Sequence, residues 1–75
     1  MPDIPAMRDA AEDQRQLKEL LASLRHCEAE LELAERNGFE FVVVSTRREI
    51  RRRHELIERH CRATGLASPL AIAGR

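Results

Sequence analysis

The residues whose types and spacing could support catalysis lie close together in His54-Glu55-Leu56-Ile57-Glu58. This pattern approaches the zinc-protease signature His-Glu-x-x-His, in which two histidines one helical turn apart hold the metal and the glutamate activates water. The fifth position here is a glutamate instead of the second histidine. A carboxylate can bind zinc, but a catalytic site also needs a third ligand, an open coordination position and a cleft. We therefore predict no metalloprotease site.

Histidine and cysteine are also adjacent twice, in Arg25-His26-Cys27 and Arg59-His60-Cys61. Neighbouring residues on a helix point about 100° apart, so one such pair cannot easily hold a single ion. A metal-sensing site would need separate elements to bring together Cys27, His54, Glu58, His60 and Cys61. Cysteine within an apolar stripe more often acts as a small buried hydrophobic residue. We predict no bound metal and no other cofactor.

Other catalytic signatures do not occur in the sequence. It contains no Glu-x-x-His pair for a di-iron site, no glycine-rich phosphate loop and no serine in a nucleophile-elbow context. We predict that the protein is not an enzyme and has no catalytic residue.

Arginine is dense in the second half of the sequence, where seven arginines lie within residues 47–62. This density is expected of a helix that meets nucleic-acid phosphates. Three of them follow a glutamate by four residues, the favourable order for an ion pair within a helix: Glu49 to Arg53, Glu55 to Arg59 and Glu58 to Arg62. The other four are candidate contacts to an acidic partner or a nucleic acid: Arg47, Arg48, Arg51 and Arg52.

The charge distribution offers a second explanation for this arginine cluster. The chain has no net charge, but residues 1–40 hold ten acids against five bases, and residues 41–75 hold three acids against eight bases. The two halves therefore attract each other, and the free arginines can pair within the protein with Glu28, Glu30, Glu32 and Glu35. Pairing within the protein and binding of an acidic partner both stay open.

A long helix accounts for most of the first half. Neither glycine nor proline occurs between Pro5 and Gly38, Asp9 and Glu12 have the spacing of a capping box, and Gly38 stands where a left-handed C-terminal cap would lie. Apolar residues recur at alternating intervals of three and four: Leu17, Leu20, Leu24, Cys27, Leu31 and Ala34. We predict a helix over about 8–37 that packs through this stripe against another helix.

Residues 39–44, Phe-Glu-Phe-Val-Val-Val, are rich in aromatic and β-branched types and predict a short β-strand. Ser45 or Thr46 can then cap a second helix over about 46–64, with Gly65 at its end. Its apolar stripe is expected to be Ile50, His54, Ile57, Cys61 and Thr64. Residues 66–75 show no lasting periodicity and predict a flexible or docking tail.

Two features predict a partner. The first helix carries a second stripe of Ala22, His26, Ala29 and Leu33 nearly opposite the first. A lone strand would also leave backbone donors and acceptors without partners. Two copies that pair their strands about a two-fold axis and pack their helices together would satisfy both features. The alternative is that residues 39–44 form an extended connector that packs on the helices.

The expected fold is thus mainly α, a single helical domain over residues 1–75. It is a two-helix antiparallel hairpin with one short connecting β-strand, completed by homodimerisation into a four-helix arrangement with a two-stranded ribbon. Self-association would also supplement the small core that a chain of 75 residues can bury. The predicted partner or dimer interface comprises Ala22, His26, Ala29, Leu33, Phe39, Phe41 and Val43.

These observations favour a small non-enzymatic protein-interaction module, a dimeric regulator, inhibitor or assembly adaptor of bacterial or phage type. Its expected partners are a second copy and another protein. The alternative is a small dimeric nucleic-acid-binding transcriptional regulator that uses the arginine-rich second helix. The sequence contains neither a basic leader nor a long apolar run, so we expect a cytoplasmic protein that does not bind membranes.

Overall fold

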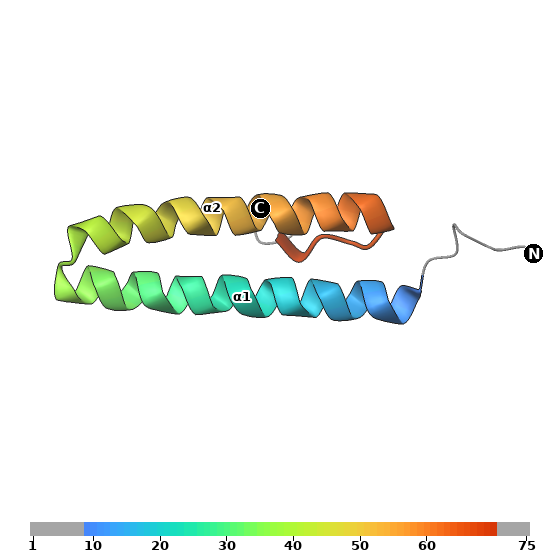
Figure 1. Ribbon diagram of the computed structural model, residues 1–75, viewed down its shortest axis with the longest axis horizontal. Coiled ribbons are helices and arrows are strands. Elements are labelled where there is room, and N and C mark those ends of the chain that lie inside the picture. The colour runs from blue at the N-terminus through green and yellow to red at the C-terminus, as the bar shows by residue number, and fades with distance from the viewer. Residues whose placement is uncertain (1–8, 71–75) are drawn as a thin grey trace, which may run out of the picture.

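The computed structural model describes residues 9–70 and shows two long helices side by side (Figure 1). Helix α1 comprises Ala10–Asn37 and helix α2 comprises Glu40–Thr64. Only two residues, Gly38 and Phe39, join them, so α2 runs back antiparallel along α1. The predicted helical hairpin is confirmed. Neither described helix carries an apolar stretch that could cross a lipid bilayer.

The limits of α1 follow from the residues at its two ends. Asp9 is the N-cap, and its carboxylate accepts a hydrogen bond from a first-turn backbone N–H at 3.1 Å. At the other end, Gly38 adopts the left-handed region with φ 74°. The backbone N–H of Phe39 donates to the carbonyl of Ala34 at 3.0 Å, which completes a Schellman cap. The predicted helix and both of its predicted capping residues are confirmed.

The predicted strand over residues 39–44 is wrong. Phe39 is the N-cap of α2, and the residues after it form the first turns of that helix, where Val43 N–H donates to the Phe39 carbonyl at 2.9 Å. The β-propensity scale spans only about 1 kcal/mol, whereas a strand without a neighbour leaves its backbone groups unpaired. Residues 9–70 contain no strand that could pair with one at this position, and a helix satisfies these groups locally. The predicted ribbon and the extended connector are therefore both wrong.

Helix α2 consequently begins six residues before its predicted start. Ser45 and Thr46, the two predicted caps, lie inside the helix. The Ser45 hydroxyl donates to the carbonyl of Val42 at 3.2 Å, and Thr46 is buried. The predicted end of α2 is confirmed, because Gly65 has φ 80° and its N–H donates to the Cys61 carbonyl at 2.8 Å.

The core lies between the two helices. Its centre is a buried cluster of Leu24, Ile57 and Cys61, and Ile57 is completely buried. Six partly buried apolar residues surround this cluster: Leu17, Leu20, Leu21, Ile50, Leu66 and Leu70. The apolar stripe predicted for α1 is therefore the stripe that contacts α2.

The last described residues, 65–70, fold back along the hairpin (Figure 1). Leu66 and Leu70 pack against the core cluster. The described part of the predicted tail is thus a docked segment. The rest of that tail, residues 71–75, lies outside the described residues, as does the predicted start of the first helix at about residue 8.

The stripe predicted for α2 is wrong at one position. His54 is exposed, and Arg53 faces α1 in its place. Arg53 Nε donates to the Cys27 sulfur at 3.3 Å, and this hydrogen bond raises the pKa of Arg53. A step of either three or four residues after Ile50 fits a helical stripe. The structure shows the step of three, from Ile50 to Arg53. Arginine suits this position because its aliphatic part can cover apolar surface while its guanidinium keeps the hydrogen bond to Cys27.

Three polar contacts connect the two helices. They are spaced along the hairpin from its closed end, where Gly38 and Phe39 form the turn, to its open end, where α1 begins and α2 ends. Arg47 pairs with Glu35 at 2.8 Å nearest the turn, and the Arg53 contact to Cys27 lies further along. Towards the open end, His60 Nε2 donates to the backbone oxygen of Asp13 at 2.9 Å. Both cysteines are free and buried.

Candidate protein-interaction surface

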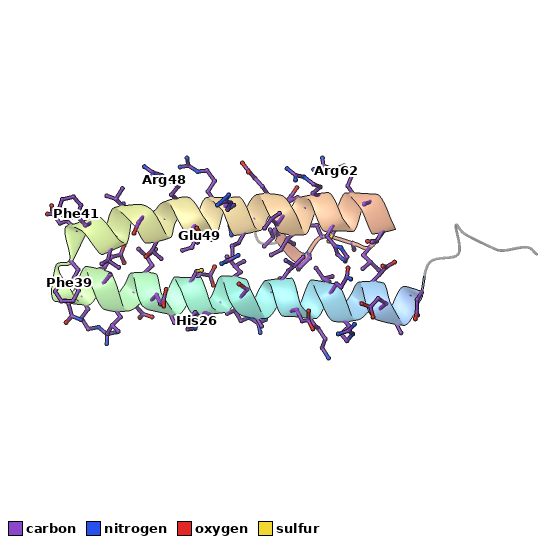
Figure 2. All side chains as sticks on the ribbon, viewed as in Figure 1. His26, Phe39, Phe41, Arg48, Glu49 and Arg62 are labelled. Carbon is purple, nitrogen blue, oxygen red and sulfur yellow. The ribbon has the colours of Figure 1, made fainter. Side chains whose placement is uncertain are left out.

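The closed end of the hairpin exposes large apolar side chains from both helices and the turn between them. The exposed fraction is 56% for Leu33, 57% for Phe39, 93% for Phe41, 43% for Val42 and 57% for Val44. Elsewhere in residues 9–70 no large apolar residue is exposed to this extent. Figure 2 shows both phenylalanines at this end of the molecule. We call these five residues the apolar tip.

A shallow hollow lies on one side of the apolar tip. It has a volume of about 240 Å³ and is lined by Glu30, Leu33, Ala34, Asn37, Phe39 and Val42. We call it the tip hollow. A second hollow of about 400 Å³ is lined by Glu35, Gly38, Glu40, Val43 and Val44. The exposed apolar surface therefore extends around the turn and not over one helix alone.

The structure brings together only part of the predicted interface. Leu33 and Phe39 meet in the tip hollow, whereas Val43 is half-buried in the second hollow. Phe41 is almost fully exposed at the end of the hairpin (Figure 2). The other three predicted residues are exposed further along α1, away from the tip: Ala22, His26 and Ala29. His26 pairs with Glu30 at 3.3 Å.

Val42 and Val44 were missed as surface residues because of the strand prediction. A strand places residues 39, 41 and 43 on one face and residues 42 and 44 on the other, and the predicted interface contains only the first three. In a helix, residues three apart share a side, and Phe39 and Val42 therefore line the same hollow. A helical interpretation of residues 39–44 would have found both valines.

The four candidate arginines divide into two groups. Arg47 binds Glu35 across the hairpin, which is the pairing within the protein that the charge distribution predicted. Arg48, Arg51 and Arg52 are exposed, and within residues 9–70 none of them forms an ion pair. Figure 2 shows Arg48 on the outer side of α2, away from α1.

The predicted ion pairs within the second helix are only partly formed. Arg53 pairs with Glu49 at 3.1 Å, as predicted. The described structure contains no ion pair between Glu55 and Arg59 or between Glu58 and Arg62. These four side chains line the outer surface of α2 instead.

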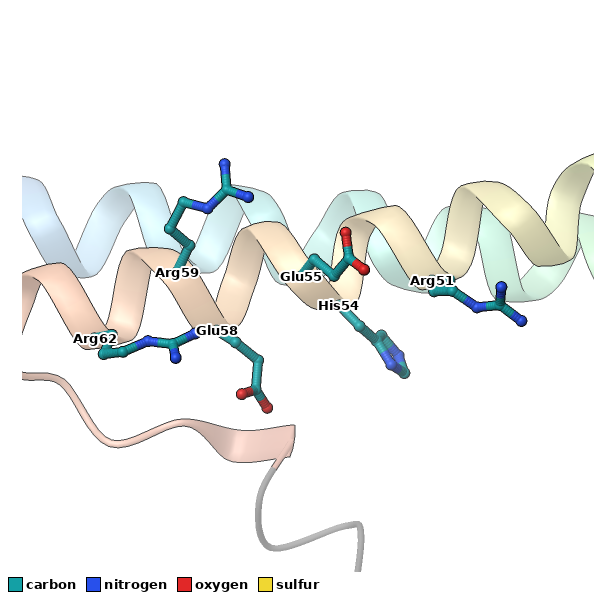
Figure 3. Close-up of a pocket in the computed structure, with 6 residues that line it drawn as sticks. All are labelled: Arg51, His54, Glu55, Glu58, Arg59 and Arg62. Carbon is teal, nitrogen blue, oxygen red and sulfur yellow. The ribbon is translucent and has the colours of Figure 1, made fainter.

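The residues that resemble a zinc signature lie in a shallow hollow on the outer surface of α2 (Figure 3). It has a volume of about 350 Å³ and is lined by Arg51, His54, Glu55, Glu58, Arg59 and Arg62. Three guanidinium groups beside this histidine and these glutamates disfavour a cation. Within residues 9–70 no three metal-ligating side chains meet closely enough to hold a metal ion.

The remaining members of the predicted metal-sensing set lie elsewhere. Cys61 is buried in the core, and burial, with a smaller contribution from the Glu58 carboxylate, raises the pKa of its thiol. Cys27 is buried under Arg53, and His60 is bonded to the backbone of α1. Hairpin packing thus accounts for each of these three side chains.

No family model, curated protein or solved structure matches this chain. The exposed surfaces of the hairpin are therefore the features from which a function can be inferred. Two of them differ from an ordinary solvated helix: the apolar tip, and the outer side of α2 with its three arginines that have no ion pair among the described residues.

Proposed function

We propose that the protein is a small non-enzymatic protein-interaction module that binds through its apolar tip. The observation that carries this proposal is the exposure of five large apolar side chains around one turn. The two phenylalanines alone leave about 300 Å² of aromatic surface in solvent. Contiguous apolar patches of this size on small soluble domains are often binding surfaces.

The exposed side chains of the tip contribute little to the hairpin itself. Phe41 and Val44 point into solvent, so they fill no space between the helices. Valine and phenylalanine also have lower helix propensity than alanine, glutamate or lysine. Polar residues at these positions would form the first turns of α2 at least as well. An intermolecular contact explains why they are apolar.

We further propose that the module works as a homodimer in a four-helix arrangement. One hairpin is a single layer of two helices, and such a layer is usually covered on at least one side by another layer. A dimeric regulator, inhibitor or assembly adaptor of bacterial or phage type in the cytoplasm suits this build. It would bind a second copy and another protein.

The test is a double variant, Leu33→Ser with Phe41→Ser, in the full chain. Both side chains are more than half exposed, so the hairpin should keep its helical circular dichroism. We expect the variant to lose both self-association in light scattering and capture of a partner from a native lysate. Ala63→Ser, an exposed position near the open end of α2, is the matched control. Unchanged mass and unchanged capture would contradict the proposal.

A second candidate function is a nucleic-acid-binding regulator. It is favoured by Arg48, Arg51 and Arg52, which are exposed and form no ion pair with any residue of 9–70. A gel-retardation assay of duplex DNA at low salt tests it, because phosphate contacts are strongest there. Arg48→Glu with Arg52→Glu should abolish retardation, and Arg36→Glu on α1 should not. Absence of retardation of the unmodified chain excludes this function.

A further inference from the structure

We propose that the tip hollow is occupied by a second copy of this chain, in one defined orientation. Helix α1 of one copy lies against α2 of the other, with the two-fold axis parallel to the helices and both closed ends at the same end of the dimer. This inference rests on the proposed function and specifies its partner.

The side of the hairpin with the tip hollow is the side that the docked tail leaves open. Glu58 and Cys61 line a hollow together with the tail residues Leu66 and Ser68. At 3.6 residues per turn, Glu58 points about 160° away from Val42 around α2. The tail therefore covers the side opposite to the tip hollow. Figure 3 shows it running on the side to which Glu58 points.

The charges near the closed end are opposite on the two helices. Residues 28–37 carry four glutamates and one arginine, and residues 40–53 carry five arginines and two glutamates. If α1 packed on the partner's α1, the two helices would run antiparallel, and each acidic segment would face residues 10–19, which hold three acids and two bases. If α1 packs on the partner's α2, each acidic segment meets a basic one. Electrostatic complementarity of this kind selects the orientation of a complex.

Two-fold symmetry allows the same side of two hairpins to meet in two ways. With the axis across the helices, α1 lies on the partner's α1 and the closed ends lie far apart. With the axis along the helices, α1 lies on the partner's α2 and the closed ends come together. The charges favour the second way, and neighbouring helices are antiparallel in both ways. The second way brings Leu33 and Phe39 of both copies to one end.

The area of this side is sufficient for a stable dimer. Helix α1 has 28 residues and α2 has 25, so the two adjacent helices present a side of about 40 by 20 Å, or roughly 800 Å². A standard stable interface buries about 800 Å² on each partner. A dimer interface on this side therefore has the usual area, even if residues outside 9–70 contribute nothing to it.

One charge on each helix is placed to meet the partner. Glu30 lines the tip hollow, whereas Glu28 points about 160° away from it around α1. On α2, Arg52 lies about 80° from Val42, whereas Arg51 lies on the opposite side. We expect Glu30 to face Arg52 of the partner copy, and the two-fold axis repeats this contact. Glu28 and Arg51 are the matched positions outside the contact.

Charge reversal tests the contact in the full chain. Glu30→Arg and Arg52→Glu should each raise the dimer dissociation constant by about tenfold or more, because each places two like-charged pairs in the interface. The double variant should return to within about threefold of the unmodified chain. Glu28→Arg and Arg51→Glu should stay within that range as well. Sedimentation equilibrium gives these constants. A double variant no tighter than the single variants would overturn the contact.

Energy transfer between labelled copies tests the orientation. Arg36 lies near the closed end and Arg15 near the open end, and both side chains are more than half exposed. A donor on Arg36→Cys should transfer more strongly to an acceptor on the partner's Arg36→Cys than to one on the partner's Arg15→Cys. The two native cysteines are buried and should react slowly with the labels. The reverse order, or no transfer at all, would overturn the proposed pairing.

The experimental result that refutes this pairing can be distinguished from the result that refutes the proposed function. A chain that stays at 8.6 kDa at every concentration, but loses a captured protein when Leu33 and Phe41 become serine, refutes the pairing and supports the module. If neither charge reversal nor the tip variants change mass or capture, both proposals fail.

Discussion

The two ends of the hairpin differ in how far their apolar side chains are buried. From its middle to its open end, the molecule buries Leu24, Ile57 and Cys61 and covers them with Leu66 and Leu70 of the docked tail. At the closed end, the five residues of the apolar tip remain in solvent. The docked tail, the third segment of the described structure, packs against the buried cluster and leaves the closed end uncovered.

This difference indicates which part of the molecule stabilises the single chain. Burial of apolar surface is the dominant favourable contribution to folding, and here it is concentrated around Ile57. The apolar tip is held in place by the turn and by the helices, but contributes little buried area of its own. Its side chains are therefore available for a partner, and substitutions at the two ends should have different consequences.

The largest effect is expected at Ile57, the one completely buried large side chain among the described residues. Ile57→Ala should lower the free energy of unfolding by about 2–5 kcal/mol, because it removes buried methyl groups and leaves a cavity. Urea denaturation followed by circular dichroism measures the change. Val44→Ala at the apolar tip is the control and should stay within about 0.5 kcal/mol. Equal losses at both positions would remove the distinction between the two ends.

A smaller effect is expected from the turn at Gly38. An added Cβ would meet no atom within 4 Å there, so Gly38→Ala should cost only the backbone strain of a left-handed conformation. That strain is about 1–2 kcal/mol. Gly65→Ala at the end of α2 has the same geometry and equally open space, and serves as the matched variant. Thermal unfolding should show similar losses. A loss at Gly65 alone would mean that the closed end can relax without penalty.

Most of the fold could be predicted from the sequence, because the signals for α1 are local and agree with each other. Asp9, Gly38 and the apolar stripe of α1 each specify the same helix, and all three are confirmed. Gly65 likewise fixed the end of α2. Capping residues act through hydrogen bonds to the nearest turn, so their positions can be recognised without knowledge of the packing.

The start of α2 and the candidate surface could not be predicted in the same way. In residues 39–44 the local preference for a strand conflicts with the absence of a partner strand, and only the packed structure decides between them. The error affects the surface as well, since the predicted interface includes Phe39, Phe41 and Val43 but neither Val42 nor Val44. His54 and Arg53 illustrate a second limit: helical periodicity allowed both, and the contact to Cys27 selected Arg53.

An effect confined to alkaline pH is expected from Cys61 in the packed region. Burial raises the pKa of its thiol above the ordinary value of 9.0, so the folded protein holds this proton more tightly than the unfolded chain. Stability should therefore be complete below the unfolded pKa and should fall as pH rises through that value towards the folded pKa. Unfolding free energies at pH 7, 9 and 10 measure the slope, which Cys61→Ala should reduce. Cys27→Ala is the comparison variant. A slope unchanged by Cys61→Ala would contradict this assignment.

The smallest effect on the single chain is expected at Phe41. Because its side chain is 93% exposed, Phe41→Ser should change the free energy of unfolding by no more than about 0.5 kcal/mol when the protein is dilute enough to be monomeric. At high concentration the unmodified chain should gain stability by mass action from its partner copy, and the variant should gain less. Phe41→Leu keeps an apolar side chain and should retain most of that gain. If the unmodified chain shows no concentration dependence, its apolar tip does not bind a second copy.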